Sequence, residues 1–161
     1  MQLTQPAAKG LDPNRTNATV NYFGSSDKVS RRVAFPENLL SPKPVDNDHG
    51  KFAYQKVFGD GDFIAAGVLV LPPQGIKPSN NAKANTLMFY LAAGTVKFSI
   101  ENDEFVLHAG GMFMVPRGNV YNIHNVGQIE AKIFFTQARR MILESTATNT
   151  TSGVPSTIAA S

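Results

Sequence analysis

Short runs of β-branched and aromatic residues, separated by turn residues, constrain the fold of this 161-residue chain more than any other feature. No stretch carries a convincing helical period, and the sequence Gly-Asp-Gly-Asp at 59–62 is typical of a hairpin turn. Eight or more short strands predict an all-β barrel or jelly roll, since both protect the sheet edges, with a two-sheet sandwich as the main rival. The predicted strands are Lys51–Phe58, Phe63–Leu71, Thr86–Leu91, Thr95–Ile100, Glu104–Leu107, Met112–Val115, Val120–His124 and Ala131–Gln137.

The flanks of the strand-rich region differ from it in composition. Both ends are rich in small polar residues without a period, which is typical of disordered tails. Upstream of the barrel, Val20–Phe23 and Arg31–Phe35 could form two further short strands before a loop made by Pro36, Pro42 and Pro44. We therefore predict a disordered tail over 1–18, an arm over 19–51 that packs on the barrel or on a partner subunit, a barrel over 52–143 and a second disordered tail over 144–161.

Composition excludes several classes of function. The chain has no cysteine, which removes disulfides, thiolate catalysis and cysteine-ligated zinc, and suits a reducing compartment. No window approaches the roughly 18 apolar residues of a membrane-spanning helix, so we expect no membrane partner. The net charge of +3 is spread along the chain and is only a weak indication of an acidic partner or DNA.

The stretch from Gly110 to Asn125 resembles the second sequence motif of the cupin superfamily. Gly110, Pro116, Gly118 and Asn125 fall on their places in that motif, whereas Tyr121 replaces its metal-binding histidine. The glycines and the Pro-x-Gly turn reverse the chain and aim the following side chain into a barrel. The resemblance therefore implies a cupin-type double-stranded β-helix, which is a jelly-roll barrel.

The first cupin motif fits between Gly75 and Gly94, but its ligands have changed. Asn81 and Lys83 occupy the two histidine positions and Leu87 occupies the glutamate position. A lysine ammonium repels a metal cation and a leucine offers no donor atom. We therefore expect neither a metal nor another cofactor.

Two segments are similar to the C-terminal domain of the centromere protein C family. These are Met112–Ile123, with its Gly-Asn-x-Tyr variant of the cupin motif, and Lys132–Arg140, with its Phe-x-Gln strand. The resemblance implies a homodimerising, non-enzymatic cupin in an inner-kinetochore scaffold, which docks other kinetochore proteins at the centromere in the nucleus during chromosome segregation. The family's nucleosome-binding motif is not visible, since the chain has no tryptophan.

Two predicted strands, 63–71 and 87–91, are apolar on both faces. Only one face of a strand can point into a small barrel, so the other must be covered by the arm or by a second subunit. We favour a symmetric homodimer over a monomer capped by residues 20–45. The candidate interface residues are Phe63, Ile64, Val68, Val70, Phe89 and Leu91.

Catalysis has little support in the sequence. The three histidines, His49, His108 and His124, show no ligand spacing. The carboxylates Glu101, Asp103 and Glu104 sit in a predicted turn, where solvation explains them. We therefore predict that the chain is not an enzyme.

Two alternatives to a dimerisation module stay open, both as a sensor or regulator. A barrel without metal could hold a small molecule against Tyr121, Asn81 and Asn125, unless its interior is filled by Leu87, Met88, Met112 and Phe113. Weak DNA contact is the second alternative, and it would weaken with salt. The cations on which it would depend are Lys28, Arg31, Arg32, Arg117, Lys132, Arg139 and Arg140.

Overall fold

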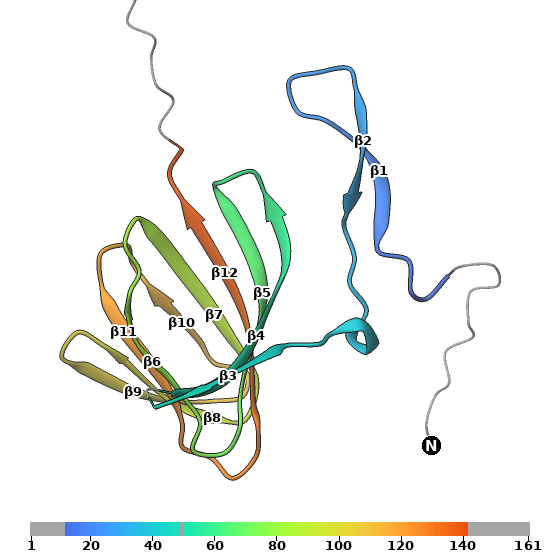
Figure 1. Ribbon diagram of the computed structural model, residues 1–161. Coiled ribbons are helices and arrows are strands. Elements are labelled where there is room, and N and C mark those ends of the chain that lie inside the picture. Colours follow the sequence, from blue (N-terminus) through green and yellow to red (C-terminus); the bar gives the residue numbers. More distant parts are fainter. Residues whose placement is uncertain (1–11, 49, 142–161) are drawn as a thin grey trace, which may run out of the picture.

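The computed structural model describes residues 12–48 and 50–141, and nearly all of its regular structure is β-strand (Figure 1). The only helix in this part of the chain is one turn of 3-10 helix, and no helix there is long and apolar enough to cross a membrane. The elements are β1 (Asn17–Asn21), β2 (Lys28–Arg32), η1 (Glu37–Leu39), β3 (Lys43–Asn47), β4 (Gly50–Asp60), β5 (Ile64–Leu71), β6 (Ile76–Asn81), β7 (Asn85–Ala93), β8 (Thr95–Ile100), β9 (Asp103–His108), β10 (Met112–Val115), β11 (Val120–Asn125) and β12 (Ala131–Arg139).

The barrel consists of two antiparallel sheets that curl toward each other (Figure 1). We call the sheet with the order β10-β7-β12-β5-β4 sheet I and the one with the order β6-β11-β8-β9 sheet II. The two are joined where Lys51 of β4 pairs with Ile76 of β6. β3 adds to sheet I by pairing with β4 alone.

All eight predicted strands are present, within three residues at each end, and two further strands were missed. β3 was predicted to be part of a proline-rich loop, and it contains Pro44. That prediction was wrong because β3 is an edge strand with a single neighbour, where a residue without an N–H is tolerated. β6 was missed because its sequence Ile-Lys-Pro-Ser-Asn-Asn does not alternate, and its pairing with β11 is irregular opposite Tyr121 and Ile123.

The arm departs from the predicted boundaries. β1 begins at Asn17, within the segment expected to be disordered, and β3 brings the start of the sheet structure to Lys43 rather than 52. β1 and β2 form a hairpin of their own that stands beside the barrel and shares no sheet with it (Figure 1). Residues 1–11 and 142–161, which include most of the two expected tails, lie outside the described residues.

The core lies between the inner faces of the two sheets. Each strand contributes every second residue, so β7 buries Leu87, Phe89 and Leu91 while the residues between them are exposed. The fully buried side chains come from both sheets, which makes the barrel one packed unit. They are Leu71, Leu91, Val96, Val115, Ile123, Asn125 and Ile133.

Candidate functional site

The four degenerate cupin ligand positions do not form a cluster inside the barrel. Asn81 pairs with Val120 on the outward face of sheet II, and its side-chain Oδ1 accepts a hydrogen bond of 2.6 Å from the backbone N–H of Lys83. Lys83 lies in the turn after β6 with an exposed side chain. Leu87 and Tyr121 point inward and are 7% and 4% exposed. The unchanged spacing therefore corresponds to one strand-end residue, one turn residue and two core residues.

The interior of the barrel is filled by aromatic rings. The ring of Phe113 lies 4.6 Å from that of Phe89 and 4.5 Å from that of Phe98, centroid to centroid, and Tyr121 packs 5.9 Å from Phe89. This agrees with the predicted filling by Leu87 and Phe113. Met88 and Met112, which were predicted to share that role, lie on the outer face with 58% and 74% of their surface exposed. The prediction failed for them because neighbouring strand residues point to opposite faces.

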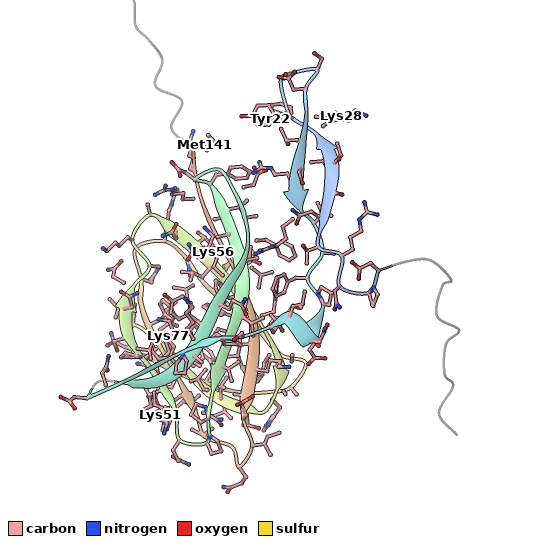
Figure 2. All side chains as sticks on the ribbon, turned by 45° about the vertical axis from the view of Figure 1, so that its right-hand side comes forward. Tyr22, Lys28, Lys51, Lys56, Lys77 and Met141 are labelled. Carbon is pink, nitrogen blue, oxygen red and sulfur yellow. The ribbon has the colours of Figure 1, made fainter. Side chains whose placement is uncertain are left out.

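A lysine inside the barrel was missed by the sequence analysis. Lys77 of β6 places its Nζ 4.3 Å from the centre of the Tyr121 ring, and Figure 2 shows it among the barrel strands. Burial lowers the pKa of Lys77 to about 8 and raises the pKa of Tyr121 to about 12. The ring face supplies the negative electrostatic potential that the ammonium needs. A lysine between a proline and an isoleucine on a weakly patterned strand gave no signal in the sequence.

Asn125 holds the end of the barrel together and does not line a cavity. Its side-chain Nδ2 lies 2.9, 3.1 and 2.8 Å from the carbonyl oxygens of Leu71, Pro72 and Ile129, and its Oδ1 accepts a bond from the Gly127 N–H. Its backbone N–H donates to the Gly75 carbonyl at 2.9 Å. Because Asn125 is fully buried, these bonds replace the water it would otherwise need.

The other scaffold positions of the two motifs lie in turns. Gly94 and Gly118 have φ values of 90° and 86°, in the left-handed region that favours glycine, and a Cβ at Gly94 would lie 2.8 Å from the Cα of Ala131. Gly110 likewise has a φ of 95° and donates its N–H to the Leu91 carbonyl at 2.7 Å. Pro116 accepts a hydrogen bond of 3.0 Å from the side chain of Asn119. These residues form the backbone reversals of the barrel.

The described residues His108, Glu101 and Glu104 make separate local contacts. Within residues 12–48 and 50–141, no three His, Asp or Glu side chains lie close enough together to hold a metal ion. His108 contacts the Thr95 hydroxyl at 3.2 Å, and His49 lies outside the described residues. Glu101 accepts the Val120 N–H at 2.7 Å, and Glu104 pairs with Lys97 at 3.0 Å, which lowers the pKa of Glu104. Both carboxylates stabilise sheet II.

The most distinctive surface is an apolar face on the outside of sheet I. Met88 pairs with Met114 across one strand boundary, and Tyr90 pairs with both Met112 and Phe134. Their exposed fractions range from 43% to 74%. We call these five residues the sheet I patch: Met88, Tyr90, Met112, Met114 and Phe134.

The predicted interface residues are only partly on this face. Phe89 and Leu91 are 4% and 0% exposed and belong to the core, so the prediction was wrong for them. They share a strand with patch residues but point the other way, because the apolar run of β7 was not divided into its two faces. Phe63 is 36% exposed at the hairpin before β5. The remaining three, Ile64, Val68 and Val70, are half-buried on the outer face of β5.

The outside of sheet II is mostly polar around β11, although Ile76, Val106 and Val120 are 37%, 59% and 39% exposed. Asn122 and His124 alternate with the buried residues of β11, and Asn122 donates to the Ser79 hydroxyl at 3.3 Å. On the neighbouring strands, Ser99 and Lys97 both contact Glu104. This face can therefore remain in water.

The basic residues considered for DNA binding are mostly engaged within the protein. Arg31 pairs with Asp60 at 2.8 Å and Lys132 pairs with Glu37 at 2.8 Å. The guanidinium of Arg32 donates to the Val57 carbonyl and lies 5.0 Å from the centre of the Phe35 ring. A further pair joins Arg139 and Asp62 at 3.7 Å. At these four positions the positive charge is therefore already paired with a carboxylate or a carbonyl oxygen of the protein.

Comparison with known proteins gives consistent matches. The sequence model of the family described as Mif2/CENP-C like matches residues 52–137. The chain is 32% identical over 108 residues to the inner kinetochore subunit cnp3 of Schizosaccharomyces pombe, covering 67% of this chain and 16% of that protein. It is 34% identical over 141 residues to human centromere protein C, covering 80% of this chain and 15% of that protein. The chain thus spans less than a fifth of the length of these two relatives.

Solved structures agree on the architecture. The cupin domain of Schizosaccharomyces pombe Cnp3 superposes with a TM-score of 0.70 at 24% identity, covering 77% of this chain and 86% of that one. A predicted oxalate decarboxylase from Thermotoga maritima superposes with a TM-score of 0.63 at 13% identity, covering 67% of this chain and all of that one. At these identities the likeness shows the fold alone, and the predicted cupin barrel is confirmed.

Proposed function

Because the chain belongs to the Mif2/CENP-C like family, we propose that its barrel is a non-enzymatic homodimerisation domain of an inner-kinetochore scaffold protein. The relatives are named inner kinetochore and centromere proteins, in agreement with the location expected from the sequence. The observation that carries the proposal is the sheet I patch, which leaves five large apolar side chains exposed on one regular surface.

The patch has the composition of an interface rather than of a solvated surface. It consists of two aromatic residues and three methionines, which are the residue types enriched where proteins associate. Its members come from adjacent strands, so the backbone that presents them is fixed by the ladders between β10, β7 and β12. Little backbone ordering is then needed when the surface is covered, and methionine adapts to the shape of what covers it.

A second copy of the same chain is the simplest partner for this face. A two-fold axis brings the same patch of both subunits together, so an apolar surface is covered by an equally apolar one. Two sheets packed face to face with their inward-pointing side chains interdigitated give a layer about 10 Å thick. In the assembled protein, sheet II and the ends of the barrel remain outside, where other kinetochore proteins dock.

Two features of the barrel favour a scaffold over the alternatives. The ring contacts of Phe89, Phe98 and Phe113 fill the interior that a small-molecule sensor would need. The ion pairs of Arg31, Lys132 and Arg139 compete with any phosphate contacts of a DNA-binding surface. Both observations support a domain that acts through protein contacts.

The test places a charge on each outer face of the barrel. In Phe134→Glu the charge falls within the sheet I patch, and in the matched control Asn122→Glu it falls on the outer face of sheet II. We expect wild type and Asn122→Glu to be dimers in sedimentation equilibrium at micromolar concentration. The dissociation constant of Phe134→Glu should rise at least a hundredfold, because the carboxylate would have to be buried without a partner. A monomeric wild type, or an unchanged dimer in Phe134→Glu, would contradict the proposal.

A further inference from the structure

The β1–β2 hairpin has little support from its own barrel. An isolated two-stranded hairpin is marginally stable in water, so it normally packs against a further surface. Its described polar links to the barrel are the Arg31–Asp60 ion pair at 2.8 Å and the bond of 3.1 Å from Arg32 to the Val57 carbonyl. Figure 2 shows its far end, with Tyr22 and Lys28, projecting away from the strands of the barrel.

The tip of the hairpin presents an aromatic side chain to solvent. The tip is a closed turn in which the Tyr22 N–H bonds to the Asp27 carbonyl at 3.0 Å and the Ser25 N–H bonds to the Tyr22 carbonyl at 3.2 Å. Gly24 has a φ of 80°, which suits its place in the turn. Between them Phe23 is 100% exposed and Tyr22 is 52% exposed. Phe23 therefore buries no surface against its own subunit, although it lines the pocket between the hairpin and the barrel.

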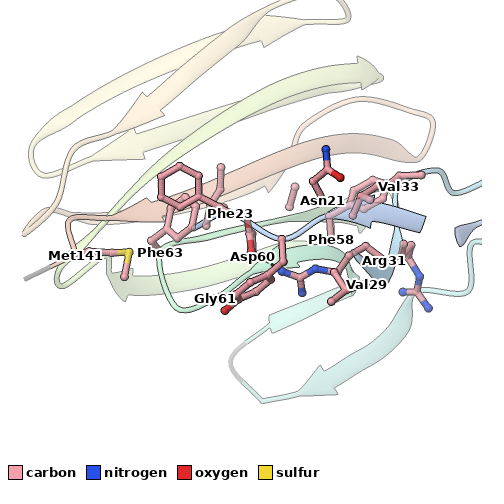
Figure 3. A pocket seen from close by; sticks show the side chains of 17 residues that line it. Asn21, Phe23, Val29, Arg31, Val33, Phe58, Asp60, Gly61, Phe63 and Met141 are labelled. Carbon is pink, nitrogen blue, oxygen red and sulfur yellow. Dashed lines mark hydrogen bonds and ion pairs between the residues drawn. The ribbon is translucent and has the colours of Figure 1, made fainter. Parts of the chain in front are cut away.

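An apolar pocket of about 670 Å³ opens between the hairpin and the barrel (Figure 3). The hairpin contributes Val20 and Val29, which pair with each other on its half-buried face, while Thr19 and Ser30 lie on the opposite, exposed face. From the barrel, Phe58 and Phe63 line the pocket. Figure 3 shows Arg31 reaching across to Asp60, which sets the distance between hairpin and barrel.

This pocket is continuous with the sheet I patch. Ala66 of β5 lines the pocket and pairs with Thr136 of β12. Thr136 pairs in turn with Met88 of β7, which pairs with Met114 of β10. One cross-strand row therefore leads from the hairpin pocket to the proposed dimer face, so both lie on the outer face of sheet I.

We propose that the β1–β2 hairpin is a clasp for the second copy of this chain, with Phe23 and Tyr22 of one subunit packed on the barrel of the other. The inference rests on the proposed function, since it requires that the sheet I patch forms a homodimer. It explains why a turn of fixed geometry presents a phenylalanine that buries no surface in its own subunit. In this arrangement, side chains of the second subunit also occupy the pocket between the hairpin and the barrel.

A cross-linking experiment tests which subunit Phe23 contacts. Because the chain has no cysteine, Phe23→Cys gives a single attachment point for a photoreactive benzophenone maleimide. The labelled protein is mixed with ¹⁵N-labelled wild type, and the cross-linked peptides are identified by mass spectrometry. We expect pairs that contain one ¹⁴N and one ¹⁵N peptide, with far fewer such pairs from the control Ser30→Cys. Exclusively ¹⁴N–¹⁴N pairs within a confirmed dimer would overturn the clasp.

A binding measurement separates the clasp from the dimer itself. Phe23→Ser should keep the circular dichroism spectrum of wild type, because this side chain is fully exposed in the monomer. Its dimer dissociation constant should rise about tenfold to a hundredfold, the usual effect of truncating a buried interface aromatic, while Ser30→Ala stays within twofold. An unchanged constant in Phe23→Ser overturns the clasp and leaves the dimer intact. A monomeric wild type would instead remove the proposed function.

Discussion

The central strands of the two sheets have matching inner faces and different outer faces. Inward, β7 contributes Leu87, Phe89 and Leu91, and β11 contributes Tyr121, Ile123 and Asn125, all of them buried. Outward, β7 carries Met88 and Tyr90. β11 carries Asn122 and His124 at the equivalent places. Both strands thus contribute three buried side chains to the core. Their outer faces differ, since β7 exposes apolar residues and β11 carries polar ones.

The residues that form the fold are therefore different from those to which we assign the association of subunits. Side chains of one strand alternate between faces, so a substitution can alter one face and leave the other intact. The inner faces preserve the barrel, although the cupin ligand positions hold Leu87 and Tyr121 in the core, Asn81 at the end of β6 and Lys83 in the following turn. The outer face of β7 carries large apolar side chains where that of β11 carries Asn122 and His124, which is why we assign the dimer to sheet I.

Shortening an inward residue should have the largest effect on stability, and it should be similar in the two strands. Leu91 and Ile123 are both fully buried, so Leu91→Ala and Ile123→Ala should each lower the free energy of unfolding by about 3–4 kcal/mol. Urea denaturation at a fixed protein concentration measures both values. A loss below 1 kcal/mol in either variant would show that the corresponding sheet does not share the core.

Lys77 should make the stability of the barrel depend on pH. Its pKa is lowered to about 8 in the folded state, so between about pH 8 and its ordinary value of 10.5 the unfolded chain binds more protons than the folded one. Stability relative to Lys77→Met should therefore rise with pH, by about 2 kcal/mol from pH 7.5 to 9.5. This window lies below the range in which Tyr121, with its pKa raised to about 12, begins to oppose the effect. The measurement is urea denaturation of both proteins across the window, and parallel pH profiles would contradict it.

Sequence patterns predicted the barrel better than its surfaces. The turn positions Gly94, Gly110 and Gly118 were recognisable because left-handed backbone restricts which residue can stand there. The orientation of Met88 against Phe89 was not, since a strand that is apolar on both faces has no alternation to read. Asn81 and Lys83 were assigned to the two histidine positions from spacing, but spacing does not fix which face of β6 or which turn a residue occupies. Lys77 escaped notice because burial of a lysine depends on a ring from a distant strand.

The smallest expected effect distinguishes the two outer faces without placing a charge on either. Tyr90→Asn and His124→Ala alter residues at equivalent positions of β7 and β11, and neither belongs to the core. His124→Ala should change the free energy of unfolding by less than about 0.5 kcal/mol at any protein concentration. A dimer that unfolds to separate chains has a midpoint that rises with protein concentration. In Tyr90→Asn this concentration dependence should weaken or disappear, because the variant loses association energy while its monomer keeps the same core. Thermal unfolding at 2 and 200 μM measures this difference, and an equal concentration dependence in both variants would mean that the outside of β7 is not the surface on which the subunits meet.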